Sequence, residues 1–296
     1  MKNILILGHK GYVGSNLKLF LENKSCNIFI LRNRSNNILR KNIHKINIII
    51  NCAGENYKTS LMNKSNFSYV KKILKFIKKY NTNIFFINLS SCSVYGENFH
   101  KKNIWIDENT TPKPISFYAI SKLNADLLIN KAYENRQIKN YAIIRAPQII
   151  SPDMKSTSYI RLIEYVKKNL FFYISNSNSV RNYVHINDLI NFIWFICKNK
   201  KVQNKKNKLF IISRHIKLSD LINYIKKKKK INSEQLILPK FFVICLSRLI
   251  NFFYPKFPLS QGIIESLTSD VIVRSNIKNF KYNFHINYDY INFIIK

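Results

Sequence analysis

The sequence ILILGHKGYVG, residues 4–14, joins an apolar strand to a glycine turn, and an apolar helical pattern follows directly. A G-x-x-G-x-x-G turn in this place lets the backbone approach a pyrophosphate, while the helix N-terminus supplies N–H donors and positive potential. The signal is specific because three of only six glycines in the chain fall in this turn. We predict a dinucleotide site whose cofactor contacts come from the turn: Gly8, Lys10, Gly11, Tyr12, Val13 and Gly14.

Short apolar runs alternate with helical patterns through the first half of the chain. This alternation is typical of β-α units that form a parallel sheet, and strands so continuously apolar need helices on both faces. The predicted strands are 3–7, 27–31, 46–52, 83–89 and 141–145, and the predicted helices are 12–22, 67–80 and 116–133.

Beyond Pro147 and Pro152 the pattern loosens into helices at 159–169, 187–197 and 219–230, with short strands near 180–184 and 209–212. We predict an α/β fold in which a Rossmann-type doubly wound parallel sheet carries a smaller C-terminal α/β substrate lobe. The NAD(P)-binding domain is expected at residues 1–152 and the lobe at 153–296, with some elements of the lobe returning to the core.

The charge of the chain is strongly positive, with 49 Lys and Arg against 15 Asp and Glu, a net charge of +34. Charged residues nevertheless make up only 22%, slightly below the usual ~25%, so the excess reflects missing acid. The sequence shows neither a recognition-helix motif nor interleaved aromatic platforms for nucleic acid. We therefore predict no specific nucleic-acid partner. The chain should be globular, since 46% of the residues are hydrophobic.

The five cysteines are odd in number, widely spaced and never in a C-x-x-C pair. This spacing argues against a disulfide framework and against a zinc site, so we predict no metal and a reducing, cytoplasmic location. The first strand follows Met1 too closely to leave room for a signal peptide.

The most apolar stretch, residues 241–254, is interrupted by Arg248 and is shorter than the ~18 residues that a spanning helix needs. We predict no transmembrane segment and expect a packing helix here, with contact to a membrane surface as the alternative. The basic run 226–230 closes a predicted helix, where cations favour the helix dipole.

The choice of coenzyme is predicted from the end of the second strand. A NAD site normally presents an acidic residue ~20 residues after the turn, whereas a basic residue there accommodates a 2′-phosphate. Arg32 occupies that place, and Lys10 lies within the glycine turn. We predict NADP(H) as the preferred cofactor, with NAD(H) as the alternative if both cations belong only to a generally basic surface.

Three residues form the predicted catalytic set. Tyr118 and Lys122 are four residues apart, so they share one face of a helix. A lysine ammonium beside a phenol favours the ionised phenolate, which makes the tyrosine a general acid or base. Ser91, at the end of the fourth strand, is expected to hydrogen-bond the substrate oxygen and orient it for hydride transfer.

With these motifs the chain resembles the extended short-chain dehydrogenase/reductase family, the NAD(P)-dependent nucleotide-sugar epimerases, dehydratases and reductases. The resemblance covers nearly the whole chain. Besides the glycine turn and the catalytic set it includes NCAG at 51–54, Tyr95-Gly96, Arg145-Ala146-Pro147 and RNYVHIND at 181–188.

The resemblance implies roles for individual residues. Ser91, Tyr118 and Lys122 are catalytic. Tyr118 and Lys122 also contact the cofactor, and Lys122 holds the nicotinamide ribose. Ala53 lines the cofactor, and Pro147 packs near the nicotinamide. Two residues are implied for the nucleotide sugar: Gln148 stands where the family often has a substrate-binding Asn, and Arg181 matches an arginine that binds the diphosphate. For Arg181 the alternative is a structural surface arginine. The resemblance also implies a homodimer through the helices that begin at Phe67 and Ser116.

The departures from the family pattern reduce the number of reactions that fit the chain. Family dehydratases carry an Asp-Glu pair after the serine or threonine, where this chain has Cys92-Ser93, so dehydration is disfavoured. The turn at 8–14, together with residues 31–34, is similar to that of the NADPH-dependent GDP-fucose synthases, whose epimerising cysteine falls at Ser93. We expect Cys92 to be a packed core thiol. His185 is expected to be structural.

We predict NAD(P)-dependent 4-ketoreduction of a nucleotide sugar in surface polysaccharide biosynthesis. The alternatives are a 4-epimerase of the same family and a non-catalytic coenzyme-binding sensor or scaffold.

Overall fold

The computed structural model describes residues 1–31, 40, 42–80, 83–100, 104–151, 158–175, 179–204, 208–232, 234–254, 264, 267–275, 277 and 282–284. Its centre is a six-stranded sheet in the order β10-β6-β4-β3-β1-β2, and every neighbouring pair is parallel. The strands are β1 (Lys2–Leu7), β2 (Cys26–Ile30), β3 (Ile48–Asn51), β4 (Phe85–Ser91), β6 (Asn140–Ala146) and β10 (Leu209–Ile211). The strand order reverses between β1 and β3, which is where ligands bind in open α/β sheets.

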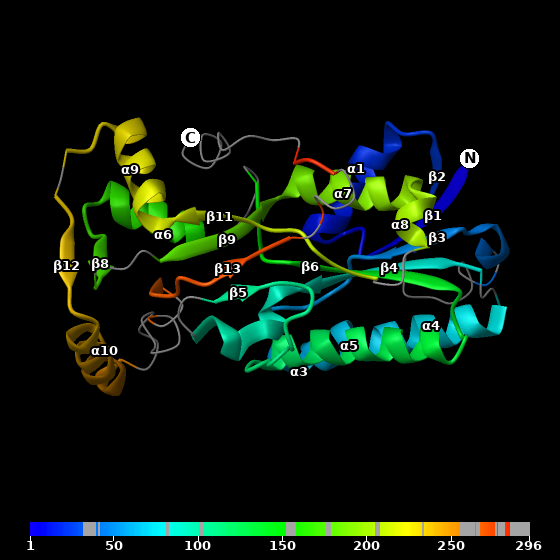
Figure 1. The fold of residues 1–296 in the computed structure, drawn as a ribbon, viewed down its shortest axis with the longest axis horizontal. Coiled ribbons are helices and arrows are strands. Elements are labelled where there is room, and N and C mark those ends of the chain that lie inside the picture. The colour runs from blue at the N-terminus through cyan, green and yellow to red at the C-terminus, as the bar shows by residue number, and fades with distance from the viewer. Residues whose placement is uncertain are drawn as a thin grey trace.

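Helices cover both faces of this sheet (Figure 1). One face carries α1 (Tyr12–Glu22), α7 (Ile186–Lys198) and α8 (Lys200–Gln203), and the other carries α3 (Thr59–Met62), α4 (Tyr69–Tyr80) and α5 (Phe117–Glu134). Alternate residues of β1 belong to different cores: Ile4 and Ile6 pack in the cluster of α1 and α7, and Leu5 and Leu7 in the cluster of α4 and α5. The Rossmann-type doubly wound sheet predicted from the apolar strands is therefore confirmed.

Besides the central sheet, the described residues form smaller sheets that involve strands of the C-terminal half of the chain. In one, β9 (Val180–His185) pairs with β7 (Gln148–Ile150) in parallel and with β11 (Arg214–Lys217) in antiparallel orientation. Two strand pairs are β8 (Phe172–Ile174) with β12 (Leu236–Leu238), and β5 (Trp105–Ile106) with β13 (Ile272–Val273).

The remaining elements are α6 (Ser158–Lys167), α9 (Leu218–Lys229), α10 (Lys240–Phe253) and the short helical segments η1 (Ile43–Lys45), η2 (Asn63–Ser68) and η3 (Cys92–His100). Elements after residue 152 also belong to the central sheet: β10 pairs with β6, and α7 covers one face of that sheet. The division at residue 152 stays a prediction.

The packing predicted for residues 241–254 is only partly found. In α10, Val243 packs against Ile174 and Ile264, but most of the large apolar side chains of the helix are exposed. The periodicity was sufficient to predict a helix, but it does not fix how much of the apolar surface finds a partner. Within the described residues, the structure contains no helix that is both long and apolar enough to span a membrane.

Candidate active site

A cavity of about 1110 Å³ lies at the carboxyl ends of β1, β3, β4 and β6, beside the reversal of strand order. It is lined by most of the residues that the sequence predicts for the site: Lys10, Gly11, Tyr12, Val13, Ser91, Tyr118, Lys122, Pro147, Gln148 and Arg181. Gly8, Gly14 and Ala53 are not among its lining residues, and Arg32 lies outside the described residues. Residues as far apart in the sequence as Lys10 and Ser269 thus line one space.

The glycine turn is packed so closely that two of its positions have no room for a side chain. A Cβ on Gly8, whose φ is +79°, would lie 2.6 Å from the backbone nitrogen of Ala53. A Cβ on Gly14 would lie 2.2 Å from the carbonyl oxygen of Gly8. These contacts explain why Gly8, Gly14 and Ala53 shape the turn without lining the cavity. Helix α1 begins after Gly11 with no capping side chain from any described residue, which suits its start to an anion.

Tyr118 and Lys122 project from the first turns of α5 into the cavity. The helix begins at a fixed place because the Oγ of Ser116 accepts a hydrogen bond from the N–H of Ala119 at 3.2 Å. Lys122 is only 7% exposed, and its Nζ lies 5.9 Å from the centre of the Tyr118 ring. The lysine charge therefore lies close to the phenol, as the four-residue spacing predicts.

A side-chain network that the sequence analysis missed supports this part of α5. Asn66, in η2, donates from Nδ2 to the Oγ of Ser121 at 2.9 Å, and Ser121 Oγ donates to the carbonyl of Tyr118 at 2.8 Å. The Oδ1 of Asn66 accepts from the N–H of Glu55 at 2.8 Å. The only signal in the sequence is a polar residue near the start of an apolar helical pattern, which is too weak to identify a contact with α5.

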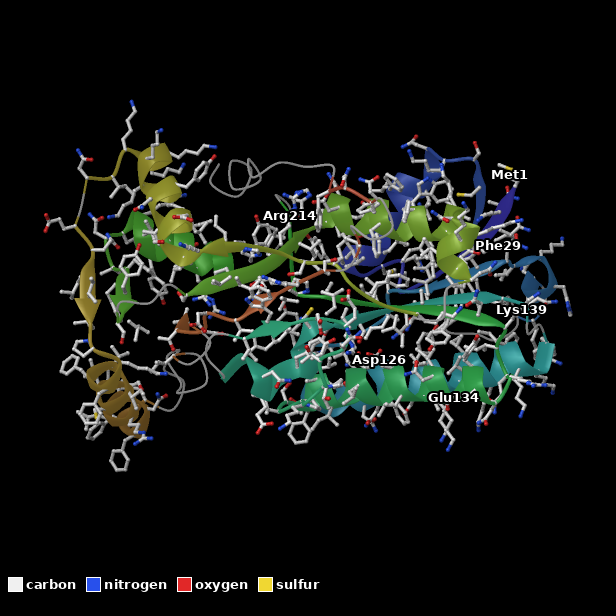
Figure 2. All side chains as sticks on the ribbon, in the orientation of Figure 1. Met1, Phe29, Asp126, Glu134, Lys139 and Arg214 are labelled. Atoms are coloured by element: carbon white, nitrogen blue, oxygen red, sulfur yellow. The ribbon has the colours of Figure 1, made fainter. Side chains whose placement is uncertain are left out.

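An ion pair is buried next to Ser90, the residue before Ser91 on β4. Asp126 Oδ2 lies 3.1 Å from Arg145 Nε, and it accepts a hydrogen bond from the Oγ of Ser90 at 2.9 Å. Arg145 also donates to the hydroxyl of Tyr95 at 2.8 Å. Burial raises the pKa of Asp126, and the charge of Arg145 opposes that rise. In Figure 2 Asp126 lies between α5 and the central sheet, so its contacts with Arg145 and Ser90 tie α5 to β6 and β4.

Two further polar residues line the cavity: Ser93, for which the sequence predicted no contact, and Arg161, which the sequence analysis did not name. The N–H of Ser93 donates to Ser91 Oγ at 3.1 Å, and the buried Ser93 Oγ has no hydrogen-bond partner among the described residues. Arg161, in the first turns of α6, lies across the cavity from the sheet together with Arg181 on β9. Arg181 donates to the carbonyl of Leu267 at 3.2 Å.

Cys92 and His185 are structural, as predicted. Cys92 is buried in an apolar cluster with Val94 and Tyr95, and burial raises the pKa of its thiol. His185 caps α7, because its Nδ1 accepts the N–H of Asn187 at 3.2 Å. Burial lowers the pKa of His185 to about 4, so the imidazole is neutral at physiological pH. All five cysteines of the chain are free.

The fold and the cavity together define the extended short-chain dehydrogenase/reductase class, with a glycine turn, a strand-end serine and a helical Tyr-Lys pair around one site. Residues 4–212 match the model of the "NAD dependent epimerase/dehydratase family". The chain therefore belongs to the NAD-dependent epimerase/dehydratase family and is an enzyme.

Known proteins resemble the chain over much or all of its length. An ADP-L-glycero-D-manno-heptose-6-epimerase of Brachyspira hyodysenteriae is 22% identical over 234 residues, 66% of this chain and 72% of that protein. The structure of UDP-glucuronic acid 4-epimerase from Bacillus cereus in complex with NAD has a TM-score of 0.72 at 17% identity and covers 99% of this chain and 100% of that one. For dTDP-4-dehydrorhamnose reductase from Yersinia enterocolitica, the TM-score is 0.69 at 18% identity, with 99% and 100% covered.

Proposed function

We propose that the protein is an NADP(H)-dependent reductase of a 4-keto nucleotide sugar. One observation carries the proposal: Ser91, Tyr118 and Lys122 line the same cavity as the glycine turn. A hydride donor bound at the turn and a carbonyl bound at the tyrosine would therefore share one enclosed space. That coincidence is what reduction with a single proton donor requires.

The residues of the turn fit a dinucleotide. The space that a Cβ would occupy at Gly8 and Gly14 is taken by backbone, so the turn keeps the tight form that a pyrophosphate needs at the start of α1. Lys10 lines the cavity and, with Arg32, supports a 2′-phosphate and hence NADP(H) over NAD(H). When bound, the nicotinamide would supply the hydride. Lys122 would hold its ribose, and Pro147 would pack near the ring.

In this proposal the residues of the chain move one proton and hold one oxygen. Tyr118 donates a proton to the carbonyl oxygen of the substrate, and the ammonium of Lys122 stabilises the phenolate that remains. Ser91 donates a hydrogen bond to the same oxygen and fixes its orientation. The N–H of Ser93 donates to Ser91 Oγ at 3.1 Å and so helps to hold the hydroxyl of Ser91 in place.

The substrate side of the cavity is suited to a nucleotide diphosphate. Arg161 and Arg181 both line it, and guanidinium groups pair well with phosphate oxygens because their N–H donors form a planar fork. One N–H of Arg181 donates to the carbonyl of Leu267 at 3.2 Å, which ties the side chain to the wall of the cavity. Gln148 lines the same space and supplies an amide for the sugar hydroxyls.

Two alternatives use the same fold. A 4-epimerase would oxidise and re-reduce the sugar with the same three catalytic residues, and two of the relatives described above are epimerases. Dehydration is less well supported, because the thiol of Cys92 is buried with a raised pKa where family dehydratases have an acid. A non-catalytic coenzyme sensor would need neither Ser91 nor Tyr118.

We also propose a homodimer with α5 at the contact. Phe117, Ile120 and Leu127 are exposed and spaced so that they form one apolar strip along the helix. A cytoplasmic location and a role in surface polysaccharide synthesis stay predictions from the sequence.

The proposal is tested by mixing the purified protein with a panel of 4-keto nucleotide sugars and following NADPH absorbance. Consumption of NADPH with formation of the 4-hydroxy sugar supports the reductase and identifies its substrate. Conversion of a 4-hydroxy nucleotide sugar to its 4-epimer without net consumption would replace it with the epimerase. Coenzyme binding without turnover of any sugar in the panel would favour the sensor.

A further inference from the structure

We propose that the far end of the C-terminal lobe docks on an anionic lipid surface. This region, which we call the lobe tip, comprises residues 226–254: the end of α9, strand β12 and helix α10. Figure 1 shows these elements together at one end of the long axis of the molecule, away from the central sheet. The inference does not depend on the proposed reaction, because the lobe tip contributes no residue to the active-site cavity.

Helix α10 exposes far more apolar surface than a packed helix does. Phe241 is 78% exposed and Phe252 is 80% exposed, and only Val243 and Ser247 of the helix are buried. In Figure 2 the side chains of α10 project outward at the end of the molecule. Several other large apolar side chains of the lobe tip are exposed: Leu236, Ile237, Phe242, Leu246, Leu249, Phe253 and Tyr254.

The exposed apolar surface continues from α10 onto β12. Leu236 and Ile237 are 61% and 52% exposed, and β12 pairs only with β8 among the described strands. A soluble monomer rarely exposes so many large apolar side chains in one stretch, and such a patch marks an interaction site. Four of the exposed residues of α10 are phenylalanines, which are suited to the boundary between lipid headgroups and acyl chains.

The charge of the lobe tip indicates which kind of partner binds its exposed apolar surface. Seven of its residues are Lys or Arg, and Glu234 is its single acidic residue. Five of the cations follow one another at 226–230, where α9 ends, and the only charged residues of α10 are Lys240 and Arg248. A second copy that docked here through its own lobe tip would bring seven more cations and one carboxylate, so self-association through this surface is opposed while an anionic bilayer is attracted.

An apolar helix face and a basic cluster are the two signals that together hold a peripheral protein on a membrane. The apolar face inserts at the boundary between headgroups and acyl chains, and the lysines pair with anionic headgroups. No helix among the described residues spans a bilayer, so the contact would be reversible and weakened by salt.

The test is co-sedimentation of the full chain with vesicles of phosphatidylcholine alone and of equal parts phosphatidylcholine and phosphatidylglycerol. We expect binding to the anionic vesicles that weakens at high salt. Phe241→Ser combined with Phe252→Ser should lower the partition coefficient about tenfold or more, because both side chains would otherwise be buried in lipid. Leu19→Ser, at a leucine of α1 that is 61% exposed, is the control and should leave binding unchanged.

The basic cluster is tested separately, which keeps the proposal falsifiable if the phenylalanine variant folds poorly. Lys227→Gln with Lys230→Gln should weaken binding about tenfold, whereas Lys71→Gln with Lys72→Gln, on the exposed side of α4, should not. An equal loss of vesicle binding in the two double lysine variants would overturn the proposal, since binding would then reflect the general charge of the protein. It is also overturned by absence of vesicle binding, or if the phenylalanine variant abolishes a dimer in sedimentation equilibrium and leaves vesicle binding intact.

Discussion

The Nζ of Lys122 donates a hydrogen bond of 2.9 Å to the backbone carbonyl of Leu89, near the end of β4. The bond joins α5 to the strand that carries Ser91, so it helps to hold the helix and the end of the strand together. It also holds the ammonium group at the base of the cavity, where it is 7% exposed. The arrangement keeps Tyr118, Lys122 and Ser91 at one cavity, as the proposed reaction requires.

Replacing the phenol should remove turnover and leave the cofactor site intact. In Tyr118→Phe the proton donor is lost, and we expect kcat to fall by about 10²–10⁴-fold. NADPH affinity should stay within experimental error, because the glycine turn and Lys122 are unchanged. Turnover is followed by NADPH absorbance and affinity by quenching of intrinsic fluorescence. Full turnover in this variant would exclude Tyr118 as the proton donor.

The packing of the glycine turn predicts that an added methyl group lowers NADPH affinity more at Gly14 than at Gly11. In Gly14→Ala the new Cβ would lie 2.2 Å from the Gly8 carbonyl oxygen, so the backbone must move and NADPH affinity should fall about tenfold or more. Gly11→Ala is the comparison, since its Cβ would meet the same oxygen at 3.3 Å and its φ of −80° suits alanine. Calorimetric titration with NADPH measures both, and an equal affinity in the two variants would contradict the prediction.

The buried ion pair should contribute to stability far more than an exposed one. Asp126→Ala leaves Arg145 buried without its carboxylate, so we expect the free energy of unfolding to fall by about 3–5 kcal/mol. Glu97→Ala removes an exposed carboxylate whose Oε2 lies 3.0 Å from the Nζ of Lys113. This change should lower the free energy of unfolding by less than about 1 kcal/mol. Urea unfolding followed by circular dichroism compares the two, and similar small losses would show that the buried pair is not structural.

The regular elements were predictable because their physical causes are local. The apolar spacing after the glycine turn predicts a helix at 12–22, and α1 has these bounds. The continuous apolar strands required cover on both faces, and the opposite packing of Ile4 and Leu5 confirms it. Lys10 and Ser91 could be assigned to one cavity because strand ends in a parallel sheet lie along one edge. Tyr118 was assigned from its spacing to Lys122 on one helix face, whereas Arg181 was implied only by the family resemblance.

The unpredicted parts depend on contacts between distant segments. Strands β8 and β12 are three residues each and pair across 64 positions, so neither has a periodicity that could be recognised. The support of α5 by Asn66 is likewise a tertiary hydrogen bond with no pattern in the sequence. Exposure of the α10 face could not be inferred either, because an amphipathic helix has the same sequence pattern whether or not a partner covers it.

The coenzyme preference should reverse with one charge reversal at the second strand. Arg32→Asp removes a cation from the 2′-phosphate and supplies an acceptor for a ribose hydroxyl, so NADPH affinity should fall about tenfold or more while NADH affinity rises. Lys45→Asp makes the same change of charge at an exposed position and should preserve the preference. Titrations of both coenzymes measure the ratio; equal affinities in the unaltered protein would contradict the assignment.

Acid should destabilise the protein partly through His185. Burial lowers its pKa in the folded state to about 4 from 6.5, so between these values the unfolded chain binds a proton that the folded chain does not. Its contribution to stability is therefore complete above pH 6.5 and is lost as the pH falls toward 4, at up to about 1.4 kcal/mol per pH unit. His185→Asn retains a side chain that can cap α7 and should remove this part of the pH dependence. His44→Asn, at an exposed histidine, should retain it. Urea unfolding at a series of pH values compares the three proteins. Parallel stability curves for the unaltered protein and His185→Asn would show that the imidazole does not stay neutral in the folded state.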